Sequence, residues 1–397
     1  FKGFSDAWEQ RKVGDLLIER NQQAPMSDEY PLMAFIANEG VAPKGERYDR
    51  SALVTDTVNK LYKKTEKGDF IYSSNNLETG SIGLNKYGKA CISPVYSIFE
   101  PTGIADSDFL GRRLVRKDFI NAMVKWRQGV IYGQWRIHES DFLKIEIPVP
   151  SVEEQRKIGA YLDQLDNLTT LHQRKFEKLT NVKKSMLEKM FPQNGSSYPE
   201  IRFKGFTDPW EQRKFGEVFD CTVPNNTLSR VELSYDEGTV LNVHYGDVLI
   251  KYGSVLDVQK DDIPRIPHRC IEDFNGALLQ DGDVIIADTA EDETTGKACE
   301  IGNLQGSAIV SGLHTMVCRP RNRMALGYLG YYLNSNAYHH QLLPLMQGIK
   351  VLSLSRSNIQ KTTVSYPSAM KEQQLIASYF SQLDHLITLH QRKFEKL

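Results

Sequence analysis

The longest periodic pattern in the chain is an apolar stripe with helical spacing. From residue 158 to residue 190, apolar side chains recur every three or four positions, interrupted once by His172. This spacing places them on one face of an α-helix of about 50 Å. A second copy runs from Ile376 to Leu397, with His390 in place of His172. We therefore predict two long spacer helices, over residues 151–190 and 368–397.

The simplest way for two amphipathic helices to bury their stripes is to pack against each other, so we expect an antiparallel coiled coil within the chain. The histidines allow a metal site or a pH switch, but a polar residue in a coiled-coil core more often fixes the alignment of the helices. We interpret His172 and His390 as such a register-setting pair. The second copy stops at Leu397, where the first continues to Met190, and we expect its helix to be truncated.

The helices are part of a duplication that covers the chain. Residues 1–12 return almost unchanged as residues 203–214, and residues 164–179 return as residues 382–397. Such repeats indicate a duplicated architecture. The segments between them diverge, so we infer two modules of one fold, held in one frame and built to contact different things.

Within the divergent modules we align a few landmarks. They are the Gly-Lys-Ala-Cys of residues 88–91 with that of 296–299, Tyr96 with His314, and the Gln-Gly of 128–129 with that of 347–348.

Short β-type runs and helical stretches alternate inside each module. The runs are residues 70–72, 95–99, 248–250, 284–287 and 315–317, and the helical stretches are 108–126 and 326–343. The fold class is therefore α/β (α+β), with two domains of similar fold. We place the first module at residues 1–150 and the second at 203–367, with a linker rich in Pro, Gly and Ser at 191–202.

Composition adds limits rather than a function. The 397 residues are 40% hydrophobic and 25% charged, which is typical of a soluble globular protein. The formal charge of −1 means that any basic surface for nucleic acid must be local. Five scattered cysteines without a Cys-x-x-Cys pair argue against a disulfide framework and a zinc site, and indicate reduced thiols in the cytoplasm.

We find no complete catalytic motif in the sequence. Residues 83–89 match the phosphate-binding pattern Gly-x-x-x-x-Gly-Lys, but Ala90 follows where a Ser or Thr should hold magnesium. We interpret this segment as a tight turn between strands. The acidic loop from Asp288 to Glu293 suggests a metal site or an acid–base pair, yet the first module has only Glu78 at the comparable place. A solvated or DNA-facing loop is the better interpretation, and we predict no catalytic residue and no metal site.

The order module–spacer–module–spacer resembles the specificity subunits of type I restriction–modification enzymes. The resemblance covers essentially the whole chain. It rests on the repeated phrase Phe-Lys-Gly-Phe-x-Asp-x-Trp-Glu-Gln-Arg-Lys and on the Pro-Ser followed by Glu-Gln that opens each spacer helix.

The resemblance implies that each module is a target-recognition domain reading half of a bipartite, asymmetric duplex DNA target. The helices would set the gap between half-sites, about one to one and a half DNA turns, and dock two methyltransferase subunits. Two restriction and translocase subunits would complete the complex. It implies that this chain binds no cofactor, and that S-adenosylmethionine, ATP and Mg belong to the partner subunits.

Residues that read DNA should be polar or charged and lie on loops, because base edges need hydrogen-bond partners and phosphates need cations. Each residue, taken alone, also suits an ordinary solvated loop, and Arg112 and Arg113 suit a plain helix surface. In the first module the candidates are Ser73, Asn75, Asn76, Lys86, Tyr87, Lys89, Tyr96, Arg127, Gln128, Tyr132, Gln134 and Arg136. In the second module they are Asp288, Thr289, Thr294, Thr295, Lys297, His314, Gln347, Lys350, Ser353, Ser355 and Arg356.

Two other functions remain open at this point. A duplicated protein-interaction adaptor without DNA contact fits the nearly neutral charge, and salt-dependent binding of duplex DNA would exclude it. A nucleotide-using enzyme would have to be built on residues 83–89.

Overall fold

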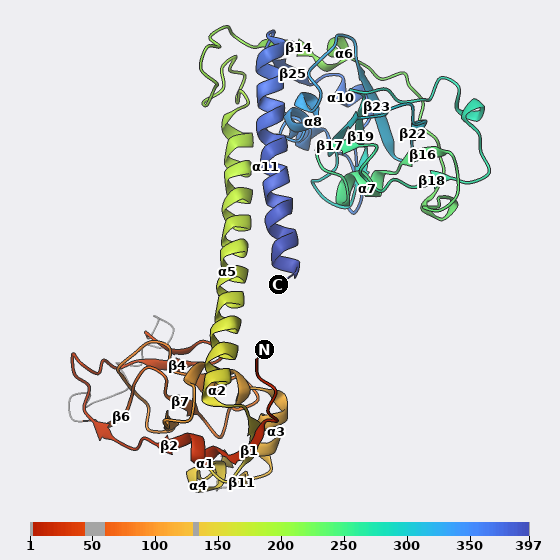
Figure 1. Ribbon diagram of the computed structural model, residues 1–397. Helices are drawn as coiled ribbons and strands as arrows, with labels where there is room; N and C mark the ends of the chain where they lie inside the picture. Colours follow the sequence, from red (N-terminus) through yellow and green to blue (C-terminus); the bar gives the residue numbers. More distant parts are fainter. Residues whose placement is uncertain (1–2, 44–59, 130–134, 397) are drawn as a thin grey trace. The chain divides into compact units, whose positions relative to one another are not determined.

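The computed structural model describes residues 3–43, 60–129 and 135–396 (Figure 1). By its internal contacts the chain divides into two compact units, Phe1–Leu168 and Thr169–Leu397. Each unit contains one module and part of the first spacer helix. No helix among the described residues is long and apolar enough to cross a membrane.

The core of the first unit is an antiparallel four-stranded sheet. Its order is β2 (Leu17–Glu19), β10 (Ser97–Pro101), β7 (Phe70–Tyr72) and β8 (Ile82–Leu84). Phe70, Tyr72 and Phe99 are fully buried on one face and pack around Phe142, with ring centroids 4.6–6.0 Å apart. Stacked and tilted aromatic pairs of this kind bury large apolar areas, so they anchor the sheet.

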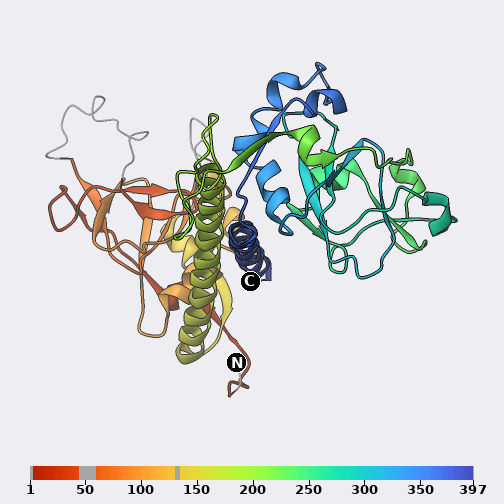
Figure 2. The ribbon, with the colours of Figure 1, turned by 90° about the horizontal axis from the view of Figure 1, so that it is seen from above.

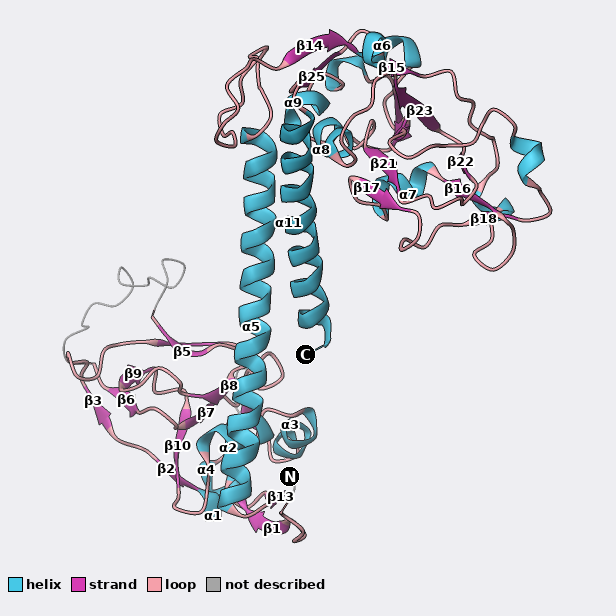
Figure 3. Cartoon of the chain, turned by 45° about the horizontal axis from the view of Figure 1, so that its top comes forward, coloured by secondary structure: helices cyan, strands magenta, loops and turns pink. Residues whose placement is uncertain are grey.

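Smaller elements surround this sheet (Figure 3). The strands form a three-stranded sheet of β3 (Gln23–Ala24), β6 (Tyr62–Thr65) and β9 (Ala90–Ile92), and the hairpin of β4 (Ala34–Ile36) and β5 (Gly40–Ala42). The helices are α1 (Val13–Leu16), α2 (Ser107–Arg113), α3 (Lys117–Val124) and α4 (Glu139–Phe142). The single helix predicted over residues 108–126 is therefore two helices, broken at residues 114–116.

The second unit repeats the sheet with one more strand. The order is β15 (Phe219–Asp220), β23 (Thr315–Pro320), β19 (Val284–Ala287), β21 (Ala298–Gly302) and β17 (Val255–Asp257). A second sheet contains β18 (Arg265–Ile266), β16 (Val240–Val243) and β22 (Ile309–Ser311). The helices are α6 (Phe215–Val218), α7 (Tyr245–Ile250), α8 (Tyr328–Leu333), α9 (Asn336–His339) and α10 (Arg356–Ile359), with single 3₁₀ turns at η3 (Arg230–Glu232), η4 (Ile271–Phe274) and η5 (Leu343–Leu345).

One predicted strand of the second module is wrong. Residues 248–250 are the last turn of α7 rather than a strand. The helix starts at His244, whose side-chain Nδ1 accepts a hydrogen bond from the backbone N–H of Gly246 at 3.2 Å. A side chain that satisfies one of the free N–H groups at a helix start favours the helix over the strand that the apolar run suggests.

The strand registers correct two of the sequence alignments. Residues 88–91 lead into β9, which pairs with β6 outside the main sheet, whereas 296–299 lead into β21 inside it. The position that matches Gly296 is Gly80, and both glycines have a positive φ. Likewise Ser97 faces Tyr72 as Met316 faces Ile286, which places Tyr96 level with Thr315 instead of His314.

The repeated opening phrase closes the base of each module. Strand β1 (Glu9–Lys12) pairs antiparallel with β13 (Glu146–Val149), and β14 (Glu211–Lys214) pairs in the same way with β25 (Thr363–Tyr366). The chain thus enters and leaves each module side by side, next to the start of a spacer helix. This explains why the phrase and the helix stay alike in both halves although they are far apart in sequence.

A buried glutamine joins each spacer helix to its module. The side-chain N–H of Gln155 donates to the carbonyl of Pro150 at 2.9 Å, and its oxygen accepts from the backbone N–H of Asp106 at 2.9 Å. Gln373 makes the same two bonds, with Pro367 and Ala325, at 2.8 and 2.9 Å. The repeated Glu-Gln pair therefore has a structural role in both copies.

The spacer helices are α5 (Val152–Lys189) and α11 (Met370–Lys396). Within the second unit they lie side by side and antiparallel, as Figures 1 and 2 show. His172 Nδ1 and His390 Nδ1 are 2.9 Å apart. Further along α5, Lys183 Nζ lies 2.5 Å from Asp384 Oδ1 of α11. The predicted antiparallel packing of the helices, with the histidines facing each other, is confirmed.

The segment predicted as a linker is partly core. Met190 and Phe191 follow α5 directly and are 4% and 0% exposed. Phe191 stacks on Phe380 of α11, with ring centroids 5.8 Å apart, and touches Trp210 and Tyr332. The apolar end of the helical stripe is therefore buried in the second module, so residues 191–202 do not act as a free connector.

Candidate nucleic-acid interface

Two loop segments of the first module that were predicted separately lie together. The guanidinium of Arg127 donates to both carboxylate oxygens of Glu78 at 2.9 and 2.7 Å. The backbone N–H of Trp135 donates to the side-chain oxygen of Asn75 at 2.6 Å, and that of Ile137 donates to Ser74 Oγ at 3.0 Å. Residues 73–80, 126–129 and 135–137 form what we call the first loop cluster.

A short hairpin forms one side of this cluster. Strand β11 (Gln128–Gly129) pairs with β12 (Trp135–Arg136). The Arg127 side chain is only 11% exposed, and its hydrogen bonds hold the pKa of Glu78 below the usual range. Arg127 therefore fixes the loop, while Asn76, Gln128 and Arg136 are exposed and available to a ligand.

Three other candidates of the first module are held elsewhere. Lys86 Nζ lies 4.0 Å from Asp163 on α5, and Lys89 forms an ion pair with Glu29, which raises the pKa of Lys89. Tyr87 is exposed on the turn between them. The carbonyl oxygen of the buried Asn85 side chain accepts from the backbone N–H of Tyr87 at 2.9 Å. Residues 85–89 therefore form a turn between β8 and β9, as predicted for the apparent phosphate-binding motif.

The second module has a matching loop cluster. Strand β20 (Thr289–Ala290) pairs with β24 (Leu352–Ser353), and the backbone N–H of Leu354 donates to the carbonyl of Asp288 at 2.8 Å. His314 Nδ1 lies 3.5 Å from Asp288 Oδ1. Residues 288–295, 314 and 347–356 make up what we call the second loop cluster. Parts of the four predicted segments thus form two clusters, one on each module, while residues 85–89 lie apart.

Several predicted contact residues are not placed to touch DNA. Thr295 is fully buried, and its hydroxyl donates to the carbonyl of Asp292 at 2.9 Å. The ammonium of Lys297 donates to the carbonyl of Leu249 at 2.8 Å, and burial lowers its pKa. Ser73 is 6% exposed. We remove these three residues from the candidate set because Ser73 and Thr295 are buried and the ammonium of Lys297 is bound to a backbone carbonyl of the fold.

Two further predictions change with the structure. Tyr96 is half-buried, its ring lies 5.3 Å from that of Phe35, and its hydroxyl donates to the Phe35 carbonyl at 3.4 Å. Arg112 is not a plain helix surface, because its guanidinium lies 2.5 Å from Asp163 and 2.7 Å from Asp166 of α5. Tyr132 and Gln134 lie outside the described residues.

The exposed candidates of the second loop cluster offer both hydrogen-bonding groups and cations. The exposed hydrogen-bonding side chains are Thr294, His314, Gln347, Ser353 and Ser355. Asp288 and Thr289 are half-buried. The cations are Lys350 and Arg356. Among the residues that the structure describes, neither cation forms an ion pair, so both are free for a phosphate.

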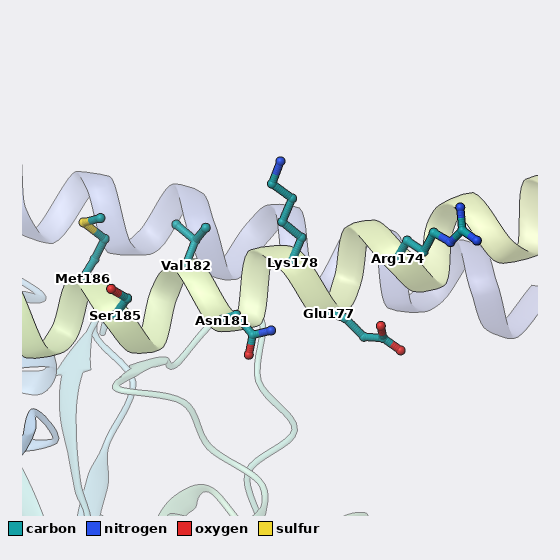
Figure 4. Close-up of a pocket in the computed structure, with 7 residues that line it drawn as sticks. All are labelled: Arg174, Glu177, Lys178, Asn181, Val182, Ser185 and Met186. Carbon is teal, nitrogen blue, oxygen red and sulfur yellow. The ribbon is translucent and has the colours of Figure 1, made fainter. Parts of the chain in front are cut away.

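A shallow groove runs along α5 on the spacer (Figure 4). Its lining combines apolar Val182 and Met186 with polar and charged side chains, namely Arg174, Glu177, Lys178, Asn181 and Ser185. The three charged side chains, Arg174, Glu177 and Lys178, recur on α11 as Arg392, Glu395 and Lys396. Within the described ranges, no group of three or more His, Cys, Asp or Glu side chains is arranged to hold a metal ion.

Comparison with known proteins identifies the class. A model of the type I restriction modification DNA specificity domain matches the chain twice, over residues 5–181 and 207–397. The type I restriction enzyme MjaVIII specificity subunit of Methanocaldococcus jannaschii is 22% identical to this chain over an alignment of 409 residues. The alignment covers 98% of this chain and 89% of that protein.

One solved structure supports the fold, and a second is similar over most of its length. The S subunit of a type I restriction–modification system from M. genitalium is 13% identical, covers 100% of this chain and 94% of its own, and superposes with a TM-score of 0.52. The HsdS subunit of Thermoanaerobacter tengcongensis, 18% identical, covers 98% and 92% with a TM-score of 0.45. The chain therefore belongs to the type I restriction–modification specificity subunits and carries two DNA specificity domains.

Proposed function

We propose that each module reads one half of a bipartite, asymmetric duplex DNA target through its own loop cluster. The observation that carries this proposal is the contrast between frame and loops. The strand pairs β1–β13 and β14–β25 and the bonds of Gln155 and Gln373 are the same in both modules. The exposed loop residues are different. One frame with two different surfaces suits one protein complex that reads an asymmetric sequence.

The same proposal assigns the remaining partners. Two methyltransferase subunits dock on the spacer, where the groove residues Arg174, Glu177 and Lys178 are repeated on α11. Two restriction and translocase subunits complete the assembly in the cytoplasm. This chain is non-catalytic: S-adenosylmethionine, ATP and Mg act in the partner subunits, and methylation requires the target base to leave the helix.

Exchanging one module should change one half-site only. The structure sets the boundaries, because the backbone bonds from Val13 to Ile145 and from Phe215 to Thr362 mark the inner ends of the two strand pairs. Residues 13–145 are replaced by those of a related chain, and methylated positions are mapped in a host that carries the methyltransferase partner. A matched exchange of residues 215–362 should change the other half-site. A change in both half-sites, or in neither, would contradict the modular assignment.

Removing Lys350 should weaken DNA binding without changing specificity. An unpaired ammonium at an exposed tip is suited to a phosphate, and each phosphate contact adds about one to the salt dependence of binding. We expect Lys350→Ala to lower the slope of log K against log salt by about one. Lys89→Ala is the matched control, because Lys89 already pairs with Glu29. This replacement should lower the slope less than Lys350→Ala does. A loss confined to one base position would count against a phosphate contact.

A further inference from the structure

The second loop cluster presents a tight and well-anchored hairpin. The backbone N–H and carbonyl of Gln347 bond to those of Ser353 at 3.0 and 2.8 Å. On its other edge, Ser353 pairs with Thr289 of β20, and the next residue, Leu354, is 4% exposed in the core. Residues 348–352 therefore form a tip whose base is held from both sides.

A glycine makes the turn of this tip. Gly348 has a φ of +126°, and a Cβ atom built there would lie 1.9 Å from the carbonyl oxygen of Val351. Only glycine accepts such an approach of the backbone. The Gln-Gly pair at the same place in the first module also opens a hairpin, β11–β12, which shows that the hairpin is part of the module design.

The tip exposes two apolar side chains on either side of a cation. Ile349 is 100% exposed and Val351 is 51% exposed. Lys350 lies between them and Arg356 follows on α10, and among the described residues neither cation has a carboxylate partner. An apolar side chain held fully in water next to a free cation fits an anionic partner that also offers an apolar group.

Duplex DNA is such a partner, because thymine places a methyl group in the major groove. The major groove is also wide enough for a two-stranded β-ribbon. Resting on the proposed DNA-reading role of the second module, we propose that Ile349 contacts the 5-methyl group of a thymine in the half-site of this module. Lys350 would meet the adjacent phosphates, so the hairpin would combine one specific and one general contact.

The experiment uses the chain assembled with its methyltransferase partner and a duplex that carries the target mapped by methylation. Each thymine of the half-site is replaced singly by uracil, which lacks only the methyl group. At one position we expect uracil to weaken binding by the wild type about fourfold, the factor for one buried methyl group. Ile349→Ala should weaken binding of the thymine duplex by about the same factor and should no longer distinguish thymine from uracil at that position.

Val231→Ala is the matched control, because Val231 is another β-branched residue of the same module and is 92% exposed on η3. The Val231→Ala complex should bind the thymine duplex and the uracil duplex with the same affinities as the wild type. Equal sensitivity of Ile349→Ala and the wild type to uracil at every position would overturn the proposal, as would a loss that affects partner assembly instead of DNA. If the wild-type complex bound no bipartite duplex, the proposed function itself would fail, which is a separate result.

Discussion

Replacing Glu372 with alanine should lower the free energy of unfolding of the second unit by about 3–5 kcal/mol, the usual cost of leaving a buried charge without its partner. The Glu372 side chain is 1% exposed and accepts from Arg202 Nε at 2.7 Å and Nη2 at 2.9 Å. It also accepts from the indole N–H of Trp210 at 3.3 Å. The variant would leave the Arg202 guanidinium, 14% exposed, with no charge to balance it.

Urea unfolding followed by circular dichroism measures this loss. Glu200→Ala removes the exposed ion pair with Lys189 and is the control, since surface pairs add little to stability. The double replacement Arg202→Met with Glu372→Leu should recover much of the loss, because it removes both charges together. An unfolding midpoint of Glu372→Ala equal to that of the wild type would show that this pair does not hold the repeated phrase to the spacer.

Glu300 should make the stability of the second unit fall as the pH rises. Its carboxyl group is 1% exposed on β21, and burial raises its pKa to about 7 from the ordinary 4.5. A raised folded-state pKa means that the folded chain holds a proton that the unfolded chain releases. The contribution is therefore fully present below pH 4.5 and is lost as the pH passes through 7, by about 3 kcal/mol in all.

Glu300→Gln tests this prediction because the amide keeps an oxygen for the backbone N–H of Gly330, which lies 2.8 Å away, but carries no charge. Unfolding free energies at pH 5, 6, 7 and 8 should decline for the wild type relative to Glu300→Gln. The exposed control Glu237→Gln should follow the wild type. Parallel curves for the wild type and Glu300→Gln would mean that Glu300 is ionised throughout this range.

The parts of the fold that depend on local periodicity could be predicted from the sequence. The spacer helices and the pairing of His172 with His390 followed from a stripe that any packing partner must cover. Alignment inside the modules failed where identity is sparse. The Gly-Lys-Ala-Cys of residues 88–91 and 296–299 recurs in strands of different sheets, and only the pairing of β10 with β7 and of β23 with β19 shows that Tyr96 is level with Thr315.

The loops show a similar limit. Polar, turn-rich composition located the four segments, and the structure brings parts of them together in pairs. Composition could not show that Thr295 and Lys297 turn inward to satisfy backbone carbonyls, since that depends on neighbours distant in sequence. Ile349 was missed because only polar and charged residues were considered as contacts, and the sequence does not show that this apolar side chain is exposed.

The strand pair at the base of each module separates two evolutionary pressures. Residues 13–145 begin and end at neighbouring points of one ladder, so substitutions confined to the first loop cluster leave in place the ladder and the bonds that Asp106 and Arg112 make to the spacer helix. Under the proposed function, drift or recombination within this interval changes the half-site that the first module recognises. The spacer residues that dock the partner subunits need not change with the target sequence.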